Sequence, residues 1–168
     1  TMLYLRRLTD DDIECVKDWI MQDYAAKWFG DVSDWVAEMK GRDDEYRFIQ
    51  HFVAEDNGTP VGFCQYYDWN AAFEDAECPE PDGSYGIDYL IGNRSYLGKG
   101  LGPEIVKIIC DKVIEENENV TQLIADPTIE EERTNVVSIK VLEANGFFYD
   151  KETGTYKKIV SSRAAKGN

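Results

Sequence analysis

The sequence predicts a mixed α/β domain in which one central sheet is flanked by helices. The chain has 168 residues, of which 43% are apolar, and this suits one globular domain. Short β-rich runs alternate with segments whose apolar residues recur at helical spacing. A glycine-dense stretch, "LGKGLG" at residues 97–102, separates an apolar strand-like run from a helix-like run. The expected order is β-α-α-β-β-β-α-β-α-β-β.

The first third of the chain favours one strand followed by two helices. Residues 3–8 are expected to form the strand, and "TDDD" at residues 9–12 is typical of a capped helix start. An aromatic connector, "AAKWFGD" at 25–31, leads to a short helix that begins at Ser33 and ends at Gly41. The first of the two helices has one apolar face, formed by Ile13, Val16, Trp19 and Ile20.

The middle of the chain predicts a hairpin, a long loop and a third strand. Two β-rich runs within residues 46–69 flank Asn57-Gly58, a pair suited to the positive φ angles of a tight turn. A polar stretch after Trp69 is expected to be a loop, and loops of this length are often functional. The next strand covers Tyr85–Ile91.

Two further helices and three strands complete the expected domain. The glycine turn opens a helix with apolar residues at helical spacing, and residues 120–126 form a short strand. A helix drawn from residues 127–148 ends at Asn145-Gly146, and strands follow with a turn near Gly154. We expect one domain over residues 1–160 and a disordered tail at 161–168.

The charge balance excludes one class of partner and suggests another. A net charge of −15 argues against nucleic-acid binding, which requires a basic face. Residues 53–93 contain no Lys or Arg but nine acids. This stretch is either a solvated acidic loop or a negative rim that attracts a cationic ligand.

Cysteine usage and hydropathy indicate a cytoplasmic protein. The four cysteines are far apart and the chain has one histidine, so no metal site is expected and the thiols should be reduced and mostly buried. No segment resembles a membrane span, and the charged start does not resemble a signal peptide.

The glycine turn fits an anion site better than the two common nucleotide motifs. A P-loop fails because five residues separate Gly92 from Gly98 and because Gly100 stands where Ser or Thr is needed. A dinucleotide fingerprint fails because its last glycine would fall on Pro103 or Ile105. The remaining alternatives are a helix start that presents backbone N–H groups to an anion, and a bare strand–helix turn.

Several motifs together resemble the GCN5-related N-acetyltransferase (GNAT) superfamily. "LGKGLG" resembles its pyrophosphate loop, although Leu97 stands where the family has Arg or Gln. "NGTPVGFCQYY" resembles its central hairpin and "NVVSIKVLEANGF" its late helix. "GID", "LGKGLG", "ADP" and "N…GF" together resemble aminoglycoside 6'-N-acetyltransferases. The resemblance implies a mostly antiparallel sheet that splays around the strand beside acetyl-CoA.

The resemblance also implies how the cofactor is held. The splayed strand, Asp88–Ile91, would pair with the pantetheine arm, and the N–H of Leu90 would polarise the acetyl carbonyl. The late helix would contribute Asn135, which is also suited to cap that helix, and Ser138. The implied cofactor residues are Leu90, Ile91, Leu97, Gly98, Lys99, Gly100, Leu101, Gly102, Asn135 and Ser138.

By the same resemblance, Asp88 is the expected general base or ammonium anchor, and Asp126 is expected to bind the acceptor. The family's usual proton donor, a tyrosine, is replaced by Leu142, which leaves water or a hydroxyl such as Tyr149. Residues expected to line the acceptor pocket are Trp28, Phe29 and Trp69.

The resemblance implies acetyl transfer to a primary amine of a cationic small molecule, such as an aminoglycoside. Alternatives are acetylation of a protein N-terminus or lysine, and a non-catalytic acyl-CoA-binding module. The chain is expected to be a monomer or a homodimer.

Overall fold

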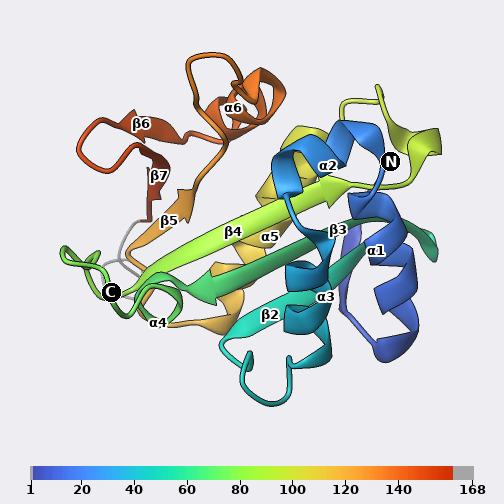
Figure 1. Cartoon of the computed structure of the whole chain (residues 1–168), viewed down its shortest axis with the longest axis horizontal. Coiled ribbons are helices and arrows are strands. Elements are labelled where there is room, and N and C mark those ends of the chain that lie inside the picture. Colours follow the sequence, from blue (N-terminus) through green and yellow to red (C-terminus); the bar gives the residue numbers. More distant parts are fainter. Residues whose placement is uncertain (1, 161–168) are drawn as a thin grey trace.

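The computed structural model describes residues 2–160, so the expected tail at 161–168 lies outside the described residues. Seven strands form one sheet in the order β1-β2-β3-β4-β5-β7-β6. All neighbouring strands are antiparallel except β4 and β5, which are parallel (Figure 1). This confirms the predicted mixed, mostly antiparallel sheet. The strands are β1 (Tyr4–Arg7), β2 (Ile49–Asp56), β3 (Thr59–Asp68), β4 (Ser84–Ile91), β5 (Gln122–Ala125), β6 (Phe148–Asp150) and β7 (Thr155–Ile159).

Helices pack on both faces of the sheet (Figure 1). Two apolar clusters fill the space between these helices and the sheet. One cluster joins α5 and α6 to the sheet, and the other joins α1, α2 and α3 to residues such as Val53, Phe63 and Leu90. Among residues 2–160, no helix is both long enough and apolar enough to cross a membrane. The helices are α1 (Ile13–Ile20), α2 (Asp23–Phe29), α3 (Val32–Lys40), α4 (Trp69–Ala72), α5 (Gly102–Glu116) and α6 (Val136–Ala144).

The N-terminal region has one more helix than predicted. The Asp12 carboxylate accepts from the Thr9 backbone N–H at 2.8 Å, which confirms the helix start expected there. The segment predicted as a connector at 25–31 was wrongly assigned, because most of it belongs to α2. Gly30, with a φ of 72°, ends that helix, and the Asp31 side chain caps the next one at Ser33 N.

The hairpin forms where the Asn57-Gly58 pair predicts it. Asn57 and Gly58 have φ angles of 48° and 84°, and β2 and β3 pair antiparallel on either side. Positive φ at both central residues is the geometry of a two-residue turn whose twist matches that of the strands.

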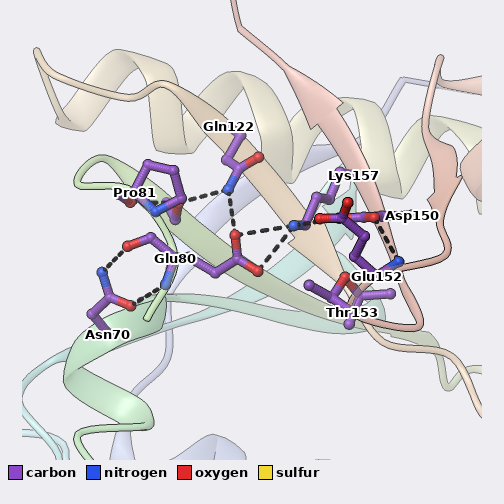
Figure 2. A network of polar contacts seen from close by, with 10 residues as sticks. Asn70, Glu80, Pro81, Gln122, Asp150, Glu152, Thr153 and Lys157 are labelled. Carbon is purple, nitrogen blue, oxygen red and sulfur yellow. Dashed lines mark hydrogen bonds and ion pairs between the residues drawn. The ribbon is translucent and has the colours of Figure 1, made fainter. Parts of the chain in front are cut away.

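The loop that follows α4 is fastened to the sheet by a partly buried charge network (Figure 2). Glu80 accepts from Lys157 Nζ at 2.9 and 3.0 Å and from Gln122 Nε2 at 3.0 Å. Lys157, which is only 7% exposed, also donates to Asp150 at 2.7 Å. The side chain of Asn70 bonds both backbone groups of Glu80. The Glu80 carboxylate therefore holds the loop against the sheet through Lys157 and Gln122.

The late helix is shorter than the sequence prediction. Only Val136–Ala144 is helical, and the preceding residues form an irregular segment with one isolated bridge, Ile129 to Thr134. The side chain of Asn135 caps the helix by accepting from Ser138 N at 3.1 Å, so the helix starts there. Gly146, with a φ of 84°, follows its end as expected.

Candidate functional site

The strand β4 separates from β5 halfway along its length. The two strands pair only from Ser84–Gly86 to Gln122–Ile124, while β4 continues to Ile91. A pocket of about 720 Å³ opens at this separation, and residues of α2, β4, the glycine turn, the end of β5 and α6 line it. The splay expected from the resemblance is therefore present, and it exposes one edge of β4 to the pocket.

The backbone groups that β4 exposes at this edge are not those of Leu90, as the resemblance implies. A Cβ added at Gly62 of β3 would meet the carbonyl oxygen of Leu90, so the Leu90 carbonyl faces β3. The N–H and C=O of one strand residue point to the same side, so the Leu90 N–H also faces β3. The Ile91 carbonyl instead accepts from the Tyr24 hydroxyl of α2 at 2.8 Å. The prediction that the Leu90 N–H polarises a bound carbonyl is therefore wrong. The backbone N–H and C=O groups that face the open edge are those of Tyr89 and Ile91.

The three alternating glycines serve two different purposes. Gly98 and Gly100 have φ angles of 72° and 73°, and a Cβ at either position would meet nothing within 4 Å. They are required by the left-handed backbone rather than by crowding. Gly102 opens α5, and its added Cβ would lie 2.9 Å from Cγ2 of Val141 on α6. Turn geometry and close helix packing thus account for the motif.

The start of α5 has no side-chain cap. Its cap residue, Leu101, accepts no such bond, and Pro103 occupies the first turn. The one acid of that turn, Glu104, accepts from Leu3 N at 2.8 Å, on β1's side of the helix. An uncapped helix N-terminus with its positive end dipole at a pocket favours an anion. Pocket-lining residues of this motif are Leu97, Gly98, Gly100, Leu101 and Gly102. Lys99 does not line the pocket, since its ammonium lies over the Tyr96 ring at 5.4 Å.

The side of the pocket formed by α6 carries two polar side chains. Asn135 lines the pocket, but its side-chain oxygen already caps the helix. The Ser138 hydroxyl is hydrogen bonded to the Tyr89 hydroxyl of β4. Burial raises the pKa of Tyr89, so this phenol stays protonated at neutral pH. A neutral hydroxyl is thus held next to the open edge of β4.

Two carboxylates face the same pocket. Asp88 is on β4, and Asp126 follows the end of β5. Burial raises the pKa of Asp88 to about 6, a hydrogen bond from Gln65 lowers it, and the charge of Asp126 raises it. Burial also raises the pKa of Asp126. A carboxylate with a pKa just below neutrality is suited to accept a proton from an ammonium group.

Aromatic residues of α2 and α3 form the facing wall. Trp28, Phe29 and Trp35 line the pocket, and the first two are among the aromatic residues expected there. Lys27 and Arg133 both lie over the Trp28 ring, with distances of 5.2 and 5.5 Å to its centroid.

Two predictions about the acceptor side are wrong. Trp69 does not line the pocket, because it opens α4 and packs against the rings of Tyr67 and Phe73. Of the nine acids in residues 53–93, only Asp88 lines it, so the stretch is not a negative rim of this pocket. Glu55, for example, pairs with Arg6, and Glu80 with Lys157.

Sequence reasoning missed Tyr89, a protonated hydroxyl that lines the pocket. Leu142 is fully buried, and Tyr149 is 46% exposed and does not line the pocket. Tyr89 does line it, next to Asp88 in the chain and on the opposite face of β4. The sequence offered one signal for Tyr89, namely that it directly follows Asp88 on the same strand. Neighbouring strand residues point to opposite faces, so the two side chains lie on either side of the sheet.

Comparison with known proteins gives a consistent set of relatives. A family model described as an acetyltransferase (GNAT) domain matches residues 9–155. An aminoglycoside N(6')-acetyltransferase type 1 of Klebsiella pneumoniae is 27% identical over 156 residues, which covers 85% of this chain and 72% of the relative. The protein of the same name from Serratia marcescens matches with the same values.

Solved structures share the fold at lower identity. Aminoglycoside acetyltransferase AAC(6')-Ib in complex with coenzyme A superposes with a TM-score of 0.73 at 21% identity, covering 99% of both chains. AAC(6')-Ib with ribostamycin and coenzyme A also gives 0.73, at 23% identity, covering 100% of this chain and 97% of the other. An aminoglycoside N(6')-acetyltransferase of Legionella pneumophila gives 0.68 at 20% identity, covering 99% and 96%.

Proposed function

Because this chain belongs to the GNAT acetyltransferases, which use acetyl-CoA to acetylate an amine, we propose that its acceptor is a small polycation such as an aminoglycoside. The match confirms the family expected from the glycine turn and the late helix. One observation carries the choice of acceptor: Asp88 and Asp126 face one pocket, opposite an aromatic wall. Two carboxylates and aromatic rings suit a ligand that carries several ammonium groups.

The residues present fit the cofactor. The backbone N–H groups of the glycine turn and of the uncapped start of α5 would hold the diphosphate. The open edge of β4, at Tyr89 and Ile91, would pair with the pantetheine arm. Acetyl-CoA, when bound, supplies the thioester that the amine attacks. The departure at Leu97 removes a polar side chain but leaves the backbone donors of the turn.

Asp88 prepares the acceptor amine for attack. A primary ammonium group must lose a proton before its nitrogen is nucleophilic, and the Asp88 carboxylate is ionised above a pH of about 6. Asp126 lines the same pocket and would anchor a second ammonium group of the acceptor. The aromatic wall would orient the rest of the molecule. The acetyl carbonyl would be polarised by a backbone N–H of the open edge, that of Tyr89 or Ile91.

Tyr89 would return a proton to the departing sulfur. Its hydroxyl is neutral because burial raises its pKa, and the Ser138 hydroxyl fixes its direction. The amine would lose one proton to Asp88 before the attack and a second proton after it. This second proton would replace the one that Tyr89 gives to the thiolate. Tyr89 of β4 would thus take the role of proton donor, which the family's helix tyrosine has and Leu142 cannot fill.

The free thiols fit the cytoplasmic location expected from the sequence, since reducing compartments keep cysteines unpaired. Cys64 and Cys110 are buried, while Cys15 and Cys78 are exposed, so the expectation of mostly buried thiols holds for only half of them. The oligomeric state, monomer or homodimer, stays a prediction.

A thermal-shift titration with acetyl-CoA, followed by an acetylation assay on kanamycin and spermidine, tests the proposal. Binding to the native protein raises the unfolding midpoint by mass action. We expect a shift with acetyl-CoA and turnover of a polyamine that Asp88→Asn lowers about 10²-fold or more while coenzyme A binding is unchanged. A thermal shift with acetyl-CoA but no turnover of any amine would favour a binding module. If acetyl-CoA gives no thermal shift, the proposed cofactor site is contradicted.

A further inference from the structure

A row of three polar side chains crosses the sheet under α1, α2 and α3. His51 of β2 is opposite Gln65 of β3, and Gln65 is opposite Asp88 of β4. Directly paired residues point to the same face of a sheet, so the row spans two strand spacings, about 10 Å. Gln65 Nε2 donates to Asp88 Oδ2 at 2.9 Å. One end of the row is therefore the carboxylate on which the proposed function rests.

The other end of the row contains polar atoms without partners. His51 and Gln65 are only 3% and 2% exposed. Neither ring nitrogen of His51 nor Oε1 of Gln65 has a hydrogen-bond partner in the structure. Buried polar atoms are nearly always paired, by protein groups or by ordered water. Three such atoms on two facing residues call for one common explanation.

The chemistry of the two side chains is complementary. Burial, with the nearby charge of Arg42, lowers the pKa of His51 to about 4, so its ring is neutral at physiological pH. A neutral imidazole has one N–H donor and one acceptor nitrogen, and Gln65 Oε1 is an acceptor. The two side chains make no direct bond in the structure, and the cross-strand spacing suits one bridging water. His51 also lines a polar cavity of about 260 Å³ with Arg7, Arg42, Asp43 and Gln50, which has room for water at its second nitrogen.

We propose that His51 and Gln65 are positioning residues, in which the His51 N–H satisfies Gln65 Oε1 through one bridging water and thereby fixes the Gln65 amide with its NH₂ group on Asp88. If the amide turned over, its oxygen would face the carboxylate and oppose ionisation. His51, which makes no contact with the pocket, thus acts on the reaction through Gln65. The inference deepens the proposed function, because it takes Asp88 to be the group that accepts the proton.

Titration of the Asp88 carboxyl carbon by NMR in the free protein tests the proposal. In Gln65→Leu we expect the midpoint to rise by about one pH unit or more, because a hydrogen bond to the charged form is lost. His51→Phe should move it in the same direction by less. The other groups that influence Asp88 are Asp126, Glu38, Tyr67 and Tyr89, and they are unchanged in both variants.

Two variants separate positioning from packing. His51 stacks on Phe63, with 6.2 Å between ring centroids, so phenylalanine keeps that contact but loses the donor. His51→Gln keeps a donor and should leave the Asp88 midpoint near that of the unmodified protein. Gln50→Leu, one residue away on β2 and bonded to Arg7 and Arg47 instead, should leave it unchanged.

The proposal is overturned if Asp88 titrates at the same pH in Gln65→Leu as in the unmodified protein, or if His51→Phe and His51→Gln behave alike. Should Gln65→Leu fail to fold, the two His51 variants decide the question. The titration needs no substrate, so it remains informative if no amine is acetylated. If acetylation is observed, the acidic limb of kcat/KM should move with the carboxyl midpoint.

Discussion

Gly102, at the start of α5, lies directly against Val141 of α6, so that a Cβ on the glycine would come within 2.9 Å of the valine Cγ2 atom. The two helices, which line one side of the pocket, therefore pack so closely that a larger residue at this position would force a shift. The neighbouring Gly100 is different, because its φ is 73° and no atom lies near its Cβ position.

This difference predicts that a smaller residue at position 141 restores stability to a Gly102 variant but not to a Gly100 variant. Gly102→Ala should destabilise the protein by about 1–3 kcal/mol through overpacking, which outweighs the helix gain of about 0.5–1 kcal/mol. Gly100→Ala should cost about 1–2 kcal/mol through its backbone angle. Adding Val141→Ala should restore stability and coenzyme A affinity in the first variant only. Denaturant unfolding and titration calorimetry measure both, and equal rescue of the two would contradict the assignment.

Removing the Tyr89 hydroxyl should slow acetyl transfer without loosening the cofactor. We expect Tyr89→Phe to lower kcat by about 10²-fold or more, since a positioned proton donor contributes that much. Coenzyme A binding should be unchanged. Tyr149→Phe, on exposed β6, is the control and should keep full activity. The reverse pattern would return the role to Tyr149.

The raised pKa of Asp88 makes stability depend on pH. Its pKa of about 6 in the folded protein lies above its ordinary value of 3.8, so the folded state holds the proton more tightly. The stability from this protonation is present below about pH 4 and is lost as the pH rises through 6.

Asp88→Asn should therefore unfold at higher denaturant than the unmodified protein at pH 7.5. A gain of about 1–2 kcal/mol is expected, reduced because Asp88 is partly exposed to the pocket. The gain should shrink as the pH falls from 6 to 4. A gain that is independent of pH would show that packing, rather than ionisation, is responsible.

The network around Glu80 predicts a large stability loss far from the pocket. Lys157→Met leaves the half-buried carboxylates of Glu80 and Asp150 without their cation, which should cost about 1–3 kcal/mol. Lys151→Met, an exposed lysine with the same change, should cost almost nothing. Chemical unfolding of both variants checks this, and similar midpoints would mean that the network does not stabilise the fold.

Local patterns predicted the parts of the fold that depend on neighbouring residues. Asn57-Gly58 indicated the hairpin turn, and Asn145-Gly146 indicated the end of α6. The segment at 25–31 was wrongly assigned as a connector because its aromatic residues give a weak helical signal. Its helix is stabilised by the packing of α2 on the sheet. Trp69 was placed in the pocket from its residue type alone, and its actual partners come from its own hairpin and helix.

By itself the sequence determined the glycine turn, the family, and the placing of Asp88 on the strand that leads into this turn. These features follow from short-range rules on backbone angles and residue spacing. Only the tertiary structure decided that the Leu90 backbone faces β3, that Tyr89 meets Ser138, and that Gln65 bonds Asp88. Each of these depends on strand register or on contacts between distant segments. Register is set by the packing of the whole sheet, and a shift of one residue reverses every face.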